Sequence, residues 1–150
     1  MNVFHMTASG TVLSEWIDRN GHMNVAAYMA LFDKGTFTLL DNCGFGSPGN
    51  DLTVVAARIL IDYRKELMEG DQWELWSGVI SVHPKYLTLT HRLRSAESLC
   101  TVCDIRGTPF SMRTRTSTSL DKEVLKSIGK RIVPGLLDRF NPNILSTSLK

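Results

Sequence analysis

The sequence of 150 residues contains no apolar run close to the roughly 18 residues that a membrane-spanning helix requires. It also lacks a positively charged segment followed by an apolar one at its N-terminus, so we expect no secretory leader. Hydrophobic residues make up 43% of the chain and charged residues 21%, a balance typical of globular domains. We therefore expect a soluble protein without a membrane partner.

Excess charge of one sign is also missing. The chain has 17 Lys and Arg against 15 Asp and Glu, which gives a formal charge of +2, and it contains no run of basic residues. Proteins that bind nucleic acid usually present a basic patch, so we expect no nucleic-acid partner. No internal repeat or linker is visible, and the length fits one domain. We place this domain at residues 1–140, followed by a loose tail at 141–150.

Cysteine is rare, with three in the chain. An odd number without a leader indicates reduced thiols and a cytoplasmic location. Cys100 and Cys103 form a C-x-x-C pair, but the surrounding sequence reads as a strand, in which residues three apart point to opposite faces. Because no second pair and no paired histidine accompany them, they offer too few ligands for structural zinc. We expect buried free thiols, no metal site and no cofactor.

The clearest periodic pattern lies in residues 25–43. Apolar side chains recur there at the spacing of one helix face for about five turns. Asn24 is a suitable N-cap, and Gly44 suits the position just after a helix. The pattern predicts one long helix over about 24–43, in which Gly35 indicates close packing against a neighbour.

The chain after this helix is rich in Val, Ile, Tyr, Trp and Thr, as strands are. Residues 96–108 fit either a short hairpin or one bulged strand, and the sequence leaves both open. The other expected elements are strands at 52–65, at 72–83, from Lys85 onward and at about 110–120, and a short helix near 135–140.

One early helix followed by four or five antiparallel strands, without helices between them, predicts an α+β domain with the helix on one face of the sheet. In the strand that starts at Lys85, alternate residues belong to opposite faces. His91 shares its face with Leu87, Leu89 and Leu93. We therefore interpret His91 as a core residue whose ring finds hydrogen-bond partners, not as a ligand of a metal or substrate.

The residues that lead into the predicted helix carry the most specific signal, and they resemble the signature of hotdog-fold thioesterases. In the 4-hydroxybenzoyl-CoA thioesterase type, an Asp is followed three residues later by a Gly and ten residues later by a Tyr of the central helix. Asp18, Gly21 and Tyr28 have this spacing. Plant acyl-ACP thioesterases show the pattern D-x-N-x-H-x-N, which is matched by Asp18, Asn20, His22 and Asn24.

This resemblance covers roughly residues 10–95 and returns faintly at 110–121. It implies a hotdog fold, in which a curved antiparallel sheet wraps a long central helix. It also implies thioester hydrolysis and a homodimer or homotetramer, since a lone wrapped sheet would leave one long edge strand unpaired.

Hydrolysis of a thioester needs an activated water or a nucleophile on one side of the carbonyl carbon and donors for the oxyanion on the other. Asp18 and the helix N-terminus could supply both, because the first N–H groups of a helix lack intrahelical partners and its dipole favours negative charge. In the hotdog family the donor is the backbone N–H seven residues after the Asp, which corresponds to Val25. The resemblance leaves open whether Asp18 attacks directly or deprotonates water.

The other polar residues of the signature have two interpretations each. His22 is either a catalytic base or orienting partner, or a loop residue satisfied by neighbouring carbonyls. Asn20 either positions water or serves the turn, and Asn24 either binds substrate or caps the helix, the reading that we favour. The resemblance places Tyr28 at the substrate site. Val25 occupies a position where some hotdog thioesterases use a His, which excludes a mechanism that needs that imidazole.

Further candidates lie outside the signature. Asp33 is a rival carboxylate, because another hotdog branch uses an acidic residue of the central helix, but an exposed helical Asp is the simpler reading. Arg113 and Arg115 alternate along the predicted last strand and could hold CoA phosphates. Arg64, with Lys65 beside it, is equally suited, although a merely solvated charged face is the simpler reading of these cations too.

Together these features predict an acyl-CoA thioesterase that hydrolyses a small or medium acyl-CoA to the free acid and CoA. The alternatives are an acyl-ACP thioesterase, a hotdog dehydratase or hydratase, and a non-catalytic acyl-binding hotdog protein. The pattern W-x-D-x-N-G-H-M-N also resembles thioesterases associated with carnitine breakdown, which would imply a short polar acyl group.

Overall fold

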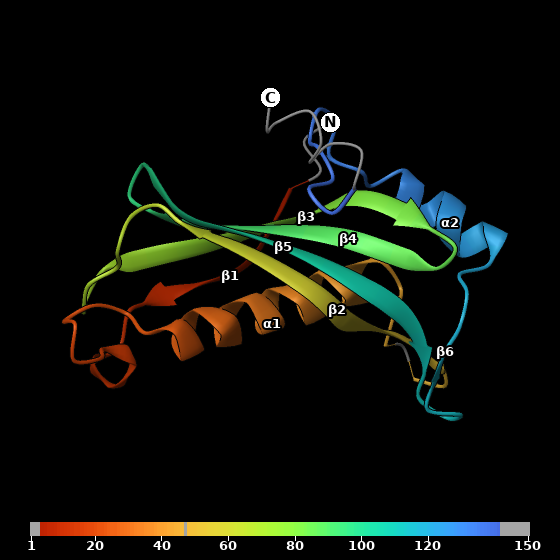
Figure 1. Cartoon of the computed structure of the whole chain (residues 1–150), viewed down its shortest axis with the longest axis horizontal. Helices are drawn as coiled ribbons and strands as arrows, with labels where there is room; N and C mark the ends of the chain where they lie inside the picture. Colours follow the sequence, from red (N-terminus) through yellow and green to blue (C-terminus); the bar gives the residue numbers. More distant parts are fainter. Residues whose placement is uncertain (1–3, 47, 142–150) are drawn as a thin grey trace.

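A long helix, α1 (Val25–Asn42), lies across one face of an antiparallel sheet (Figure 1). The structure is a computed structural model that describes residues 4–46 and 48–141. Asn24 caps α1 with its side-chain oxygen, and Gly44 has a φ of +88° just after the helix. The predicted helix, its cap and its terminating glycine are therefore confirmed.

Among the described residues, six strands form one sheet in the order β1-β3-β4-β5-β2, with β6 paired to the end of β5. All the pairs are antiparallel, and β1 and β2 lie at the two edges. The strands are β1 (His5–Thr11), β2 (Leu52–Tyr63), β3 (Gln72–His83), β4 (Tyr86–Ser95), β5 (Ser98–Ser111) and β6 (Thr116–Ser117), and the short helices are η1 (Ser14–Trp16) and α2 (Lys122–Gly129).

The predicted strands at 52–65, at 72–83 and from Lys85 are confirmed as β2, β3 and β4 within two residues at their ends. The open region 96–108 proves to belong mainly to one long strand, β5, which starts after a tight turn. Strand β1 was not predicted from the sequence.

The C-terminal third differs from its prediction. The expected strand at 110–120 is wrong, because β5 already ends at Ser111 and only Thr116 and Ser117 pair again as β6. The helix expected near 135–140 is also wrong. The helix forms at Lys122–Gly129, where the Asp121 side chain accepts a hydrogen bond from the N–H of Val124 and caps it. The predicted tail at 141–150 lies, except for its first residue, outside the described residues.

The two cysteines of the C-x-x-C pair do not point to opposite faces, contrary to the prediction. Cys100 has no partner in the β4–β5 register, where the pairing shifts by one residue. This bulge turns both Cys100 and Cys103 into the core beside α1, where both are buried and free, as expected. Burial raises the pKa of the Cys103 thiol to about 12, so it remains protonated and unreactive.

Helix α1 approaches the sheet very closely at Gly35. A Cβ atom at this position would lie 2.6 Å from a methyl carbon of Leu75 and 3.1 Å from the hydroxyl oxygens of Ser77 and Thr7. The glycine therefore allows the helix backbone to pack directly on β1 and β3, and its predicted role is confirmed. Two apolar clusters fill the space between helix and sheet on either side of this contact.

The opposite face of the sheet is polar and is crossed by residues 133–140, called the outer-face segment here (Figure 1). Asp138 accepts hydrogen bonds from Arg106 at 2.5 Å and from Thr88 at 3.0 Å. Its neighbour Arg139 donates to Asp104 at 2.5 Å and also to Asp62. These two adjacent residues of opposite charge attach the segment to β2, β4 and β5. None of the helices in the described part of the chain is long and apolar enough to span a membrane.

His91 is completely buried between α1 and the sheet, as the pattern predicted. Its Nδ1 lies 2.7 Å from the hydroxyl of Ser77 and its Nε2 lies 2.9 Å from the hydroxyl of Thr36, so both ring nitrogens have partners. Its ring stacks on Phe32 with centroids 6.0 Å apart. Burial lowers the pKa of His91 to about 3, so the ring is neutral in the folded protein at neutral pH.

We predict that this neutral histidine makes stability depend on pH. In the unfolded chain His91 would titrate near its ordinary pKa of about 6.5. Its contribution is therefore fully present above pH 6.5 and is lost as the pH falls toward 3, because only the unfolded chain then binds the proton. The free energy of unfolding should fall by about 2 kcal/mol between pH 7.5 and pH 5, measured by urea denaturation.

The variant His91→Gln, which keeps hydrogen-bonding groups but cannot gain a charge, should lack this loss. The matched control His83→Gln, at an exposed position at the end of β3, should retain it. Parallel pH profiles for wild type and His91→Gln would contradict the assignment.

Candidate active site

The loop between η1 and α1 is held in one conformation by backbone hydrogen bonds. A tight turn closes where the N–H of Gly21 donates to the carbonyl of Asp18 at 2.9 Å, and Gly21 has a φ of +81° that favours glycine. The N–H of Met23 donates to the carbonyl of Leu67 at 2.8 Å, and that of Asn24 to the carbonyl of Trp16 at 2.8 Å. These bonds fix Asp18 relative to the start of α1.

The Asp18 carboxylate folds back on its own turn. Its Oδ1 accepts a hydrogen bond from the backbone N–H of Asn20 at 2.7 Å. Within residues 4–46 and 48–141 the other oxygen, Oδ2, has no hydrogen-bond partner. The N–H of Asn20 thus orients the carboxylate and leaves one of its oxygens available to a substrate or a water molecule.

His22 is half-buried and faces the same loop. Its Nδ1 lies 3.1 Å from the carbonyl oxygen of Met23. A carbonyl oxygen cannot donate a hydrogen bond, so Nδ1 carries the proton in this contact, and in the neutral ring Nε2 is then an acceptor. This tautomer would suit either a base or an acceptor that orients a water molecule.

The N-terminus of α1 lies directly after this loop. The Oδ1 of Asn24 accepts a hydrogen bond from the N–H of Ala27 at 2.8 Å, so the side chain of Asn24 acts as the cap. The N–H of Val25 belongs to the first turn and has no acceptor within the helix. The Val25 side chain is 63% exposed, which leaves space in front of the helix end.

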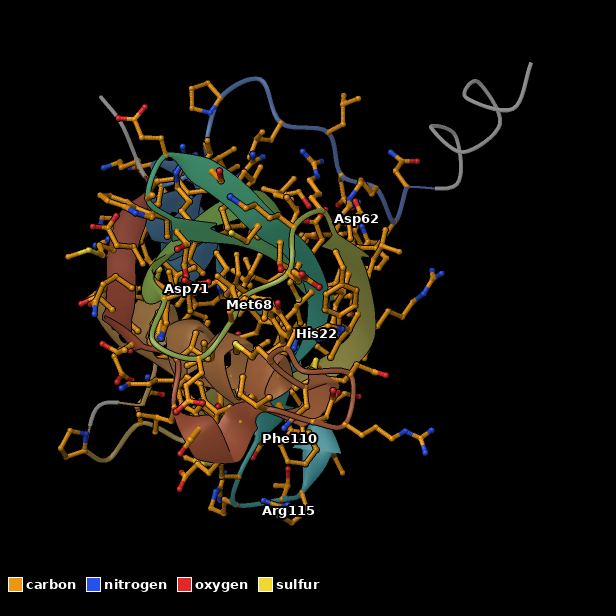
Figure 2. All side chains as sticks on the ribbon, turned by 90° about the vertical axis from the view of Figure 1, so that its left-hand side faces the viewer. His22, Asp62, Met68, Asp71, Phe110 and Arg115 are labelled. Atoms are coloured by element: carbon orange, nitrogen blue, oxygen red, sulfur yellow. The ribbon has the colours of Figure 1, made fainter. Side chains whose placement is uncertain are left out.

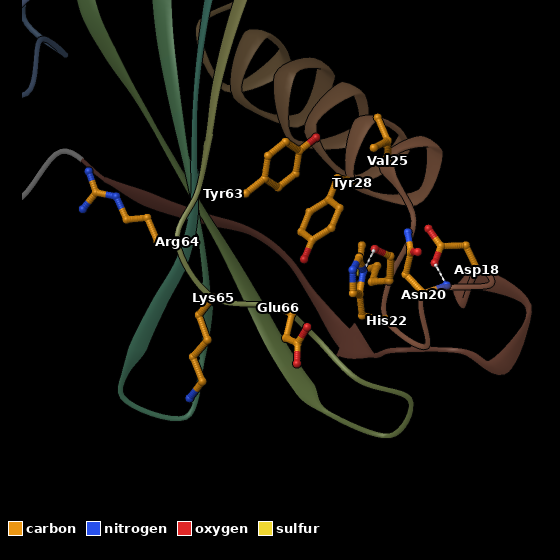
Figure 3. Close-up of a pocket in the computed structure, with 10 residues that line it drawn as sticks. Asp18, Asn20, His22, Val25, Tyr28, Tyr63, Arg64, Lys65 and Glu66 are labelled. Atoms are coloured by element: carbon orange, nitrogen blue, oxygen red, sulfur yellow. Dashed lines mark hydrogen bonds between the residues drawn. The ribbon is translucent and has the colours of Figure 1, made fainter.

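A cavity of about 340 Å³ opens at this point (Figure 3). Tyr28 from α1 and Tyr63 from β2 meet edge to face in it, with ring centroids 5.1 Å apart. Burial raises the pKa of both phenols, so both stay neutral. The lining residues are Asp18, Asn20, His22, Met23, Val25, Tyr28, Tyr63, Arg64, Lys65 and Glu66.

Six of the residues expected at the site therefore line one cavity, and Lys65, which the sequence named beside Arg64, lines it too. Three further lining residues were missed, namely Met23 within the signature itself, Tyr63 at the end of β2 and Glu66 shortly after it. The sequence pointed to the segment after β2 through the cations Arg64 and Lys65 and through the resemblance, which covers roughly residues 10–95. Arg64 borders the cavity, but Figure 3 shows its side chain directed away from Asp18.

The remaining candidates lie elsewhere. Asn24 is not among the residues that line the cavity. Arg113 and Arg115 belong to the turn between β5 and β6, which lies at the opposite end of the sheet from the start of α1 (Figure 1). Figure 2 labels Arg115 near Phe110, and its guanidinium lies 5.1 Å from the centroid of that ring. Asp33 is exposed and lines a separate cavity of about 260 Å³ between α1 and β2. Within one chain, Arg113, Arg115 and Asp33 are therefore not brought to the cavity of Asp18.

Metal ligands do not gather at the site. Among the described residues there is no group of three or more His, Cys, Asp or Glu side chains that could hold a metal ion. The chemistry that the geometry offers is a carboxylate, an imidazole and a helix N-terminus around one cavity.

A long helix wrapped by one antiparallel sheet, with a carboxylate loop at the start of the helix, defines a hotdog α+β domain. A family model described as the thioesterase-like superfamily matches residues 12–128. The chain therefore belongs to the thioesterase-like superfamily.

Solved structures support the fold. A hypothetical protein from Staphylococcus aureus, described in complex with CoA, has a TM-score of 0.77 and 20% identity, covering 96% of this chain and 92% of that one. A putative thioesterase from Pseudomonas putida gives a TM-score of 0.70 with 20% identity, covering 92% of this chain and 93% of that one. At this level of identity the likeness confirms the predicted hotdog fold and nothing finer.

One curated relative adds information on chemistry. A betainyl-CoA thioesterase from Pseudomonas aeruginosa is 28% identical over 85 residues, which cover 55% of this chain and 54% of that protein. The chain thus spans about half the length of the curated relative it matches. Both the family and this relative are named for thioester hydrolysis.

The role of Asn24 can be tested by two substitutions. Asn24→Ala should lower the free energy of unfolding by about 1 kcal/mol, because the cap hydrogen bond is lost. Asn24→Asp should keep both the cap and kcat, since a carboxylate accepts the same N–H. Stability comes from urea denaturation and kcat from a thioesterase assay. If Asn24→Asp is stable but inactive, the amide NH₂ contacts the substrate and the cap is not its main role.

Proposed function

We propose that this protein hydrolyses the thioester bond of a small acyl-CoA, with Asp18 and the N-terminus of α1 acting on opposite sides of the carbonyl. The observation that carries the proposal is that the Asp18 carboxylate and the residue that opens the helix, Val25, line the same cavity. A carboxylate and unpaired helix N–H groups are the two elements that the reaction requires.

The N–H of Val25 would donate to the carbonyl oxygen as it gains negative charge, aided by the helix dipole. Asp18 would either attack the carbonyl carbon or take a proton from the water that attacks it. In both routes the C–S bond breaks, CoA leaves as a thiolate that is then protonated, and water supplies the second oxygen of the acid. His22, through Nε2, would be the base or would orient the water, and Asn20 holds the Asp18 carboxylate.

The acyl group that we propose first is small and cationic, as in betainyl-CoA. Tyr28 and Tyr63 present aromatic rings to the cavity, and the carboxylate of Glu66 lies on its rim. Aromatic faces and a nearby carboxylate are suited to a quaternary ammonium group. The relative that hydrolyses betainyl-CoA by its name gives independent support.

The alternatives have less support. Acyl-CoA is favoured over acyl-ACP because the curated relative is by its name a CoA thioesterase. A dehydratase or hydratase would use Asp33, which lines a different cavity from His22. The available Oδ2 of Asp18 argues against a purely acyl-binding role.

We also propose that the protein is at least a homodimer, in which the β2 strands of two chains pair antiparallel. The edge strand β2 exposes a run of residues that includes Val55, Ile59 and Leu60. A two-fold axis through β2 would put Leu52 of one chain beside Tyr63 of the other. The β5–β6 turn that follows the Leu52–Ser111 pair would then approach the partner's cavity. In this arrangement Arg113 and Arg115 of the partner subunit would bind one of the phosphate groups of CoA.

A panel of acyl-CoAs that includes betainyl-CoA, assayed with a thiol reagent, tests the proposed activity. On the fastest substrate, Asp18→Asn should lower kcat by at least about 10² with little change in KM, because the amide keeps the shape but neither accepts a proton nor attacks. His22→Ala should match this loss if His22 is the base and should lose less if it only orients.

Asp33→Asn is the matched control and should keep most of the activity, because Asp33 lies in the other cavity. Thermal melts would confirm that each variant is folded. A folded Asp18→Asn variant with nearly full kcat would refute the assignment of the catalytic residue, and no hydrolysis of any acyl-CoA would refute the function.

The oligomeric state is tested separately by light scattering at micromolar concentration. We expect a mass of two or four times the 16.8 kDa of one chain. Replacing Ile59 by Lys should weaken pairing because a charged side chain replaces an apolar one at the contact between the two β2 strands, whereas Lys in place of exposed Leu137, outside β2, should not. A monomer in the wild type would contradict the proposal.

A further inference from the structure

Another cavity lies on the sheet face that α1 does not cover, and the proposed reaction leaves it unused. It measures about 270 Å³ and is enclosed by β3, β4, β5 and the outer-face segment. Arg64, Arg92 and Arg139 reach it from three different parts of the chain. Thr90 and Asp104 form its floor, directly opposite each other in the β4–β5 register.

Several buried polar atoms around this cavity have no hydrogen-bond partner. Six such side-chain atoms occur among the described residues, and four of them belong to residues that line this one cavity. Buried polar groups in folded proteins are nearly always paired with protein groups or ordered water, so their gathering marks this cavity as a place for a polar occupant. The four atoms are Oγ1 of Thr90, Nε of Arg92, Oδ1 of Asp104 and Nη2 of Arg139.

Positive charge exceeds negative charge around the cavity. Arg139 already donates to the carboxylates of Asp104 and Asp62, whereas Arg64 and Arg92 have no carboxylate partner among the described residues. Burial lowers the pKa of Arg92 most. The carboxylate of Asp104 raises this pKa, and the positive charges of Arg64 and Arg139 lower it. The guanidinium of Arg92 also lies over the ring of Phe4, 5.3 Å from its centroid. A bound anion would balance this excess.

We propose that this cavity binds a phosphoryl group that carries a proton. Arg92, Arg139 and the Thr90 hydroxyl would donate hydrogen bonds to its oxygens, and Arg64 would be a further donor. Guanidinium groups commonly form such bonds with phosphate. The P–OH group would donate to Oδ1 of Asp104, which has no other donor in the described structure. A sulfate ion has similar size but carries no proton near neutral pH, so its oxygens would repel this carboxylate.

Two sources could supply the phosphoryl group. Arg64 borders both this cavity and the one at Asp18, so a phosphate of bound CoA is one source, and that part rests on the proposed function. Free phosphate is the other. The site itself is defined by residues that the proposed reaction does not use, apart from Arg64.

The test is calorimetric titration of the full chain with inorganic phosphate at about pH 6.5, with sulfate at equal ionic strength as the comparison. Phosphate should bind at least tenfold more tightly than sulfate. This difference corresponds to about one charge-assisted hydrogen bond, the one that the P–OH group would donate to Asp104. Thr90→Val, which keeps the side-chain shape, and Arg92→Gln should each weaken phosphate binding about tenfold or more. Arg94→Gln, on the same strand but outside this cavity, should have no effect.

Equal weak responses to phosphate and sulfate that do not change in Thr90→Val would mean an adventitious ion only, and would overturn the proposal. Displacement of phosphate by CoA but not by dephospho-CoA would assign the site to the 3′-phosphate of CoA, and displacement by neither would assign it to free phosphate, and both outcomes support the proposal. Displacement by both would assign the site to the diphosphate, which carries no proton at this pH, and would overturn the proposal of a protonated phosphoryl group. Because the titration needs no turnover, phosphate binding without acyl-CoA hydrolysis would refute the proposed function alone.

Discussion

The close approach of α1 to the sheet at Gly35 is the constraint on which the rest of the structure depends. Any side chain there would collide with Leu75, so the helix backbone rests directly on β3. Beside this contact, buried His91 joins Thr36 of the helix to Ser77 of the sheet through both ring nitrogens. Apolar packing alone would allow the helix to slide, whereas these directional bonds fix its position along the sheet.

Because the helix is fixed on the sheet, its N-terminus has one position. The loop before the helix then positions Asp18 relative to that N-terminus. Because Met23 is bonded to Leu67 and Asn24 to Trp16, the loop connects the helix start to the segment between β2 and β3 and to η1. Asp18 is therefore oriented by backbone atoms, not by a partner of opposite charge. Such a carboxylate stays accessible, which a catalytic residue must be and an ion-paired one would not be.

The features that the sequence predicted correctly are those set by near neighbours in the chain. The helix, its Asn24 cap and the turn at Gly21 depend on contacts within a few residues, and the signature around Asp18 follows from them. Tyr63 and Glu66 join the site only through the pairing of β2 with β5, which no local pattern reveals. The outer-face segment was missed for the same reason: its position is set by Asp138 and Arg139, whose partners lie 32 to 77 residues away in sequence.

The two faces of the sheet therefore carry different kinds of side chain. The inner face carries the neutral His91 and apolar side chains, so it can support the helix but offers no charge to a substrate. Charged residues are concentrated on the outer face and at the end of β2, where Arg64 lies between the two cavities. A substrate with a neutral thioester and a multiply charged phosphate portion matches this division. The reactive carbonyl would meet Asp18 and the helix end, while the anionic portion would meet arginines that the reaction itself does not need.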